Sequence, residues 1–129
     1  MQAWKTIYKE LDNIDIFVKY KKDIEDCFKK LTEELSLNSE QLKRQLVEVE
    51  CYRMRVGHIL AAVEALKSAR KSDLWKEKGV VQRGDSERYK AYVEDEIKEY
   101  TYLVGMLEWM MTSIDARLAF GKKIMDNSP

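Results

Sequence analysis

Apolar side chains recur in steps of three and four residues over most of this chain, and this spacing constrains its fold more than any other feature. Between about residues 86 and 125, eight successive positions follow these steps, namely Val93, Ile97, Tyr100, Val104, Leu107, Met111, Ile114 and Leu118. Such steps place one apolar stripe along an α-helix, whereas a half-buried strand alternates every second residue. The sequence therefore predicts a long helix over 86–125.

Two earlier stretches show the same helical period. A helix is expected at about 3–36, although Asp12 and Asn13 interrupt its pattern, so either one long helix or a short helix followed by a longer one fits. A second helix is expected at about 39–71, where the stripe consists of Leu42, Leu46, Val49, Arg53, Val56, Leu60 and Val63. Each of these segments is long enough to pack against another.

Two segments lack the period and are expected to connect the helices. Around Leu37-Asn38-Ser39 the pattern stops, and an Asn or Ser side chain there can accept a hydrogen bond from the first amides of the next helix. The segment 72–85 contains Gly79 and Gly84 and is expected to form the one substantial loop.

Composition and length agree with a single all-α domain over residues 1–129. The chain has one proline and five glycines among 129 residues, which leaves little material for the many turns of a β-sandwich or barrel. Long helices joined by a short turn and one loop predict antiparallel packing in a bundle or an extended coiled coil. Wide apolar stripes on so few elements favour a homo-oligomer, although a three- or four-helix monomer could also bury them.

The sequence offers no set of residues for enzymatic chemistry, so no catalytic residue, metal or cofactor is predicted. His58 is the only histidine and has no second ligand at suitable spacing. No glycine-rich phosphate loop and no nucleophile elbow occurs in the chain. The acidic residues Glu94, Asp95, Glu96 and Glu99 fit a solvated helix face better than a pair of catalytic carboxylates.

The sequence also favours a cytoplasmic protein. No run of about 18 apolar residues occurs, which excludes a membrane-spanning helix, and the first residues lack a signal-peptide core. Cys27 and Cys51 stand inside helical patterns, which is typical of free thiols in a reducing compartment. If the protein is encoded by a phage, that compartment is the cytoplasm of the bacterial host.

Charge is balanced over the whole chain but not along it. The chain has 23 basic and 23 acidic residues, yet residues 67–90 carry eight basic and four acidic side chains. Lysine and arginine can neutralise phosphates, and an exposed indole can stack on unpaired bases. The candidate nucleic-acid-binding residues are Lys67, Arg70, Lys71, Trp75, Lys76, Lys78 and Arg83. The alternative is that the cations stabilise a helix end and that Trp75 anchors a core.

Two stretches resemble the UvsY family of phage recombination mediators. Leu66-Lys67-Ser68-Ala69-Arg70-Lys71, leading through Trp75 to Gly79, is similar to that family's basic helix end and glycine loop. Leu107-Glu108-Trp109, Ile114-Asp115-Ala116-Arg117 and Gly121-Lys122-Lys123-Ile124 are similar to its C-terminal helix. The N-terminal third departs from the family pattern, and a single Trp75 replaces the paired tyrosines that precede the family's loop.

This resemblance implies a function, a set of partners and an assembly. It implies single-stranded DNA binding by Lys67, Arg70 and Lys71, with a recombinase and a single-strand-binding protein as partners in DNA recombination and repair. It also implies that the C-terminal helix assembles the homo-oligomer through the stripe from Val93 to Leu118. The alternative hypothesis is a helical interaction module, such as a small phage regulator or inhibitor of a host protein, because Met106, Met110 and Met111 favour adaptable protein contacts.

Overall fold

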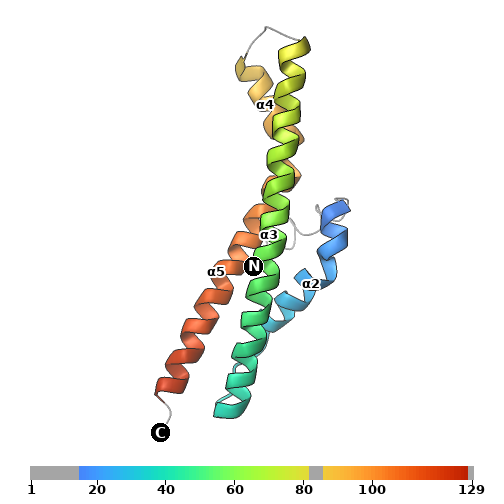
Figure 1. The fold of residues 1–129 in the computed structure, drawn as a ribbon. Coiled ribbons are helices and arrows are strands. Elements are labelled where there is room, and N and C mark those ends of the chain that lie inside the picture. Colours follow the sequence, from blue (N-terminus) through green and yellow to red (C-terminus); the bar gives the residue numbers. More distant parts are fainter. Residues whose placement is uncertain (1–14, 82–85, 128–129) are drawn as a thin grey trace.

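The computed structural model describes the backbone of residues 15–81 and 86–127 and the side chains of 17–77 and 87–127. The prediction of an all-α protein is confirmed for this part of the chain (Figure 1). The helices are α2 (Asp15–Thr32), α3 (Ser39–Val81), α4 (Ser86–Glu96) and α5 (Lys98–Asp126). The predicted break near Asp12 and Asn13 lies outside the described residues. Within those residues, no helix combines the length and apolar composition needed to cross a bilayer.

Helices α3 and α5 form the main pair and lie side by side over most of the length of α5 (Figure 1). At the lower end of the pair, Gly121 lies against the Leu46 side chain. Farther along, the Arg53 guanidinium is 2.7 Å from a carboxylate oxygen of Asp115. As residue numbers increase along α3, the residues that they contact on α5 therefore have decreasing numbers.

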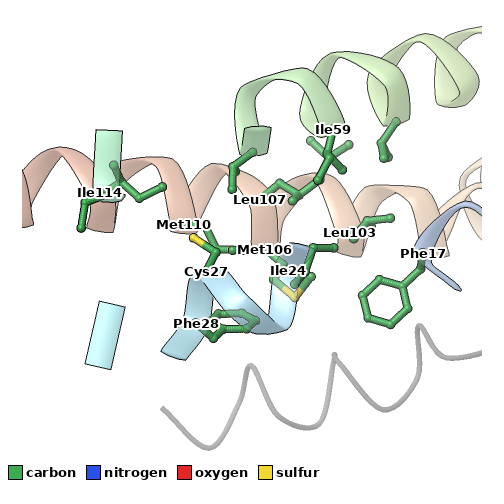
Figure 2. Close-up of a cluster of buried hydrophobic side chains, with 14 residues drawn as sticks. Phe17, Ile24, Cys27, Phe28, Ile59, Leu103, Met106, Leu107, Met110 and Ile114 are labelled. Carbon is green, nitrogen blue, oxygen red and sulfur yellow. The ribbon is translucent and has the colours of Figure 1, made fainter. Parts of the chain in front are cut away.

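The main core lies where α2 packs across this pair (Figure 2). Its most deeply buried side chains come from all three helices and include Phe17, Ile24, Cys27, Val56, Val63, Leu103, Leu107, Met110 and Ile114. Burying one large aliphatic or aromatic side chain contributes about 1.5–3 kcal/mol relative to leaving it in water. The apolar stripes that the sequence shows are thus buried within one chain.

The turn between α2 and α3 is held by side chains at both helix ends. The Asn38 side-chain oxygen accepts hydrogen bonds from the amides of Glu40 (3.1 Å) and Gln41 (3.2 Å), which confirms the predicted cap. Helix α2 ends at Thr32, four residues before the predicted end. There the Arg117 guanidinium donates to the carbonyl oxygen of Leu31 at 3.1 Å and to that of Glu33.

The predicted loop at 72–85 is wrong for residues 72–81, because α3 continues through them to Val81. The extension is stabilised by a second, smaller core in which Leu74 is fully buried against Val93 and Ile97. Gly79 costs up to about 1 kcal/mol of helix propensity, and contacts with a neighbouring helix can offset a cost of that size. Residues 82–85 lie outside the described part of the chain.

The predicted helix over 86–125 is present but is divided at Ile97. This residue has φ −105° and ψ 5°, and no side chain caps the new helix there. The Ile97 N–H nevertheless donates to the carbonyl oxygen of Val93 at 3.1 Å, and the Thr101 N–H donates to the carbonyl oxygen of Ile97 at 3.0 Å. Ile97 therefore separates α4 from α5 while its own backbone N–H and C=O keep helix-type hydrogen bonds.

Candidate nucleic-acid interface

The predicted basic segment lies on what we call the distal arm, which consists of residues 64–81 of α3 together with α4. Figure 1 shows α4 beside the upper end of α3, beyond the region where α2 packs. The small core of Leu74, Val93 and Ile97 joins the two helices. The distal arm therefore has its own buried cluster, while Lys71, Lys76 and Arg70 of its described residues are exposed.

Trp75 is half-buried in this arm and does not form the exposed platform that DNA stacking would require. Its ring packs edge-on against Tyr89, with 5.3 Å between centroids and 62° between planes. The Tyr89 hydroxyl donates a hydrogen bond to the carbonyl oxygen of Leu74. Tyr92 lies 5.5 Å beyond Tyr89 and is 47% exposed. This packing supports the alternative in which Trp75 anchors a core.

Arg70 is drawn toward an acidic helix end. Its guanidinium lies 3.8 Å from the carboxylate of Glu96, in a partly exposed ion pair. The fold also places Glu94 beside Lys67 and Lys71. Along the sequence, Glu94, Asp95, Glu96 and Glu99 together with Lys98 reduce the net charge from +4 over residues 67–90 to +1 over residues 67–99.

A smaller set of cations remains concentrated in one place, which we call the lysine hollow. It is a depression of about 330 Å³ between α3 and the α4–α5 break, lined by Lys67, Lys71, Glu94, Ile97, Lys98, Thr101 and Tyr102. Three lysines thus surround one carboxylate, and Lys98 is itself 3.6 Å from the exposed Asp95. Tyr102 is 43% exposed, so the hollow has an aromatic wall.

The lysine hollow divides the predicted DNA-binding residues into groups. Lys67 and Lys71 line it, while Arg70 is paired with Glu96 and Trp75 packs against Tyr89. Lys76 is exposed on α3. The side chain of Lys78 and the whole of Arg83 lie outside the described residues.

Sequence analysis missed Lys98 and Tyr102 as candidate residues. Each pair of hollow residues is spaced four apart on its helix, Lys67 with Lys71 and Lys98 with Tyr102, so each pair shares one helical face. That spacing could have indicated a common face on each helix. It could not have shown that the two faces meet, because their meeting depends on how α3 and α5 pair.

The eight stripe positions predicted for the oligomer are used inside the single chain. Val93, Ile97, Val104, Leu107 and Ile114 are at most 8% exposed, and Tyr100, Met111 and Leu118 are partly buried against the same clusters. Within the single chain these side chains pack against other helices, and their assignment to an intersubunit surface stays a prediction. Homo-oligomerisation itself stays a prediction.

A second depression, which we call the apolar groove, lies at the opposite end of the molecule. It has a volume of about 750 Å³ between the end of α2, the following turn and α5. Its walls include Leu37 and Phe120, which are 86% and 59% exposed, and Trp109, which packs 5.9 Å from Phe28. Exposed apolar side chains gathered in this way are typical of a surface that contacts another protein.

Neither depression has the residues of a metal centre. The described part of the chain contains no group of three or more His, Cys, Asp or Glu side chains that could hold a metal ion. No protein-family model, curated protein or solved structure matches the chain.

Proposed function

We propose that the protein is a non-enzymatic single-stranded DNA-binding protein that acts as a recombination mediator or accessory factor. The observation that carries this proposal is the lysine hollow, where Lys67, Lys71 and Lys98 surround one depression beside the exposed ring of Tyr102. The lysines attract the phosphate backbone, and the ring stacks on an unpaired base. A duplex would offer no unpaired base to this ring.

The wider role is proposed from the resemblance to the UvsY family. By that resemblance the protein would be an oligomer of antiparallel helices in the cytoplasm of a bacterial host, and it would help to load a recombinase onto DNA covered by a single-strand-binding protein. An oligomer would repeat the lysine hollow along one DNA strand. Several weak contacts would then act together through a high effective concentration.

The direct test is fluorescence anisotropy of a labelled oligonucleotide at several salt concentrations, with single strand and duplex compared. The combined variant Lys67→Ala, Lys71→Ala and Lys98→Ala is expected to lose at least tenfold in affinity for single strands. Its salt dependence should also become weaker, because each lost phosphate contact removes about 0.7 from the slope of log K against log salt. Tyr102→Ala should weaken binding as well, while Tyr102→Phe keeps the stacking surface.

The control is a variant that loses the same number of positive charges at sites away from the lysine hollow. Lys29, Lys43 and Lys122 are exposed on α2, α3 and α5, away from the distal arm. Changing these three to alanine gives the same net charge as the test variant. Equal affinities of the two variants would contradict a site at the lysine hollow, and absence of binding by the unmodified protein at low salt would contradict the proposed function.

The second candidate function, a helical module that occupies a host protein, is favoured by the apolar groove. Phe120→Glu would place a charge in that groove while leaving the distal arm unchanged. A stoichiometric host protein that is lost in this variant, together with no affinity for DNA, would favour this function over the first. Retention of the same host protein by the Phe120→Glu variant would exclude the groove as its docking site.

A further inference from the structure

Helix α3 carries a second stripe on the side that faces away from its own core. We call it the outer seam, and it consists of Val47, Cys51, Met54, His58, Ala61 and Ala65. These positions are separated by alternating steps of four and three residues, and all six side chains are exposed. Val47 and Met54 are 64% and 74% exposed, which is unusual for large apolar residues.

The outer seam is distinct from the stripe that builds the core. The buried positions of α3, among them Val49, Val56 and Val63, face α2 and α5. The seam positions fall about half a turn away from them, because each residue advances the helix by about 100°. In a chain in which 36% of residues are charged, the seam has no acidic residue, lysine or arginine over three heptads. Ser68 and Ser72 extend the same spacing without charge.

A stripe of this length indicates that another helix packs on it. Five of the six seam positions are apolar and the sixth is His58, and the flanking positions include Glu48, Glu50, Arg55 and Glu64 beside the uncharged Gly57 and Ala62. A largely apolar stripe that keeps the four-three spacing over three heptads is the pattern of a coiled coil. The seam covers 18 residue steps, or about 27 Å of helix at 1.5 Å per residue. The three other described helices pack on the opposite side of α3 or beside it, so none of them covers the seam.

We propose that the outer seam binds the outer seam of a second copy of this chain, with the two α3 helices parallel and in register. The charges that flank the seam select this partner. In a parallel pair, Glu50 of one copy faces Arg55 of the other, five residues farther on, and symmetry makes this contact twice. Both side chains are exposed, and the only ion-pair partner that the structure shows for Arg55 is Asp23, at 3.8 Å.

The same flanking charges disfavour the antiparallel arrangement. If two seams overlapped fully in opposite directions, Glu50 of each copy would face Glu64 of the other. The two Arg55 side chains would also meet near the centre of the interface. Like charges placed opposite each other suppress a pairing, so charge complementarity favours the parallel register.

The proposed dimer names a surface through which the oligomer of the proposed function would form, but it does not depend on DNA binding. The lysine hollow lies between α3 and the start of α5, whereas the outer seam lies on the side of α3 that points away from α5. Each surface therefore stays accessible when the other is occupied. If the protein forms the dimer but does not bind DNA, this inference is correct and the proposed DNA binding is wrong. If the protein binds DNA as a monomer, this inference is wrong and the proposed DNA binding is correct.

Sedimentation equilibrium of the full chain tests the proposal through the mass of the species in solution. We expect the unmodified protein to sediment as a dimer or a larger assembly. Met54→Glu combined with Ala61→Glu should reduce the mass to that of a monomer, with the helical circular dichroism unchanged. Val18→Glu is the matched control, because Val18 is 58% exposed on α2 and lies outside the seam.

Cys51 reports the direction of the helices. In a parallel pair in register, the two Cys51 side chains face each other at the distance that a disulfide requires, so mild oxidation should yield a covalent dimer. Cys51→Ser should abolish this product, because Cys27 is buried. A monomer at every concentration, or an assembly that persists in the Met54→Glu and Ala61→Glu variant, would overturn the proposal. An assembly that needs the seam but forms no Cys51 crosslink would overturn the parallel register.

Discussion

The two cysteines show how strongly a side chain's place in the fold determines its chemistry. Cys27 is fully buried in the main core, and burial raises the pKa of its thiol from 9.0 to about 12, because the charged thiolate would lose its hydration. Cys51 is exposed on α3. Both stand in similar helical patterns in the sequence, so only the packing of α2 distinguishes the inert thiol from the reactive one.

This difference predicts how the thiols react and how stability depends on pH. In the Met54→Glu and Ala61→Glu variant, which is expected to be a monomer, a thiol reagent should label Cys51 alone, and it should label Cys27 only after unfolding. Between pH 9 and about 12 the unfolded chain loses the Cys27 proton while the folded chain retains it, so the free energy of unfolding should fall as the pH rises. The expected slope is roughly 1 kcal/mol per pH unit.

Urea unfolding at a series of alkaline pH values measures this slope, and Cys27→Ala is the reference. The alanine variant should be less stable at neutral pH, because it leaves a small cavity, but its stability should depend less on pH in this range. An identical slope in the two proteins would show that other groups, such as lysines and tyrosines, account for the alkaline loss.

At the scale of helices, the sequence predicts those helices that carry a regular apolar stripe. It does not predict the helix ends that are stabilised by contacts with other helices. The stripe through Val56 and Val63 has a clear period, and the structure buries it. The extension of α3 to Val81 was hidden, because Lys67 and Arg70 occupy the stripe positions that precede Leu74. The sequence shows a lapse of apolar residues there, whereas in the fold α4 supplies the missing partner surface.

The candidate site follows the same division between local pattern and tertiary contact. Lys67 and Lys71 were predictable, because they belong to a local excess of positive charge. Lys98 was not predictable, because it follows the acidic residues Glu94, Asp95 and Glu96, so a count of local charge shows no positive excess there. Arg70 belongs to the same basic excess, but it meets Glu96 across 26 residues of chain, and that pairing depends on the break at Ile97.

Two glycines on α5 test how closely α3 and α5 approach each other. At Gly121 an added Cβ would overlap the Leu46 side chain, whereas at Gly105 it would meet nothing within 4 Å. Gly105→Ala should therefore stabilise the protein by roughly 1 kcal/mol through helix propensity. Gly121→Ala gains the same propensity but forces the terminal methyl groups of Leu46 to move, so its net stabilisation should be smaller.

Thermal unfolding of both variants measures the difference directly. The melting temperature of the Gly105→Ala variant should rise, and that of the Gly121→Ala variant should lie below it. Equal stabilisation by the two changes would mean that Leu46 yields freely and that the helices are not closely packed at this end.

At the scale of the whole molecule, the chain has two cores of unequal size. The main cluster combines α2, α3 and α5, whereas the distal arm depends on Leu74, Val93 and Ile97. Tyr100 packs against both clusters and is the described side chain that joins them. A region with few buried contacts opens at a lower free energy than the rest of the fold, so the distal arm should open before the main cluster does.

Leu74→Ala and Leu107→Ala are matched substitutions that distinguish the two cores. Each removes a fully buried leucine side chain, which typically costs about 2–5 kcal/mol. Leu107→Ala should reduce amide protection in α2, α3 and α5 together, because it weakens the main cluster. Leu74→Ala should reduce protection mainly in α4 and in the end of α3, and should leave α2 close to its original protection.

Native-state hydrogen exchange resolves these patterns helix by helix. If Leu74→Ala lowered the protection of α2 as much as Leu107→Ala does, the chain would unfold as one cooperative unit. The lysine hollow would then be as rigid as the main core. If only the arm responds, the hollow is formed by an element that can open on its own while the rest of the molecule stays folded.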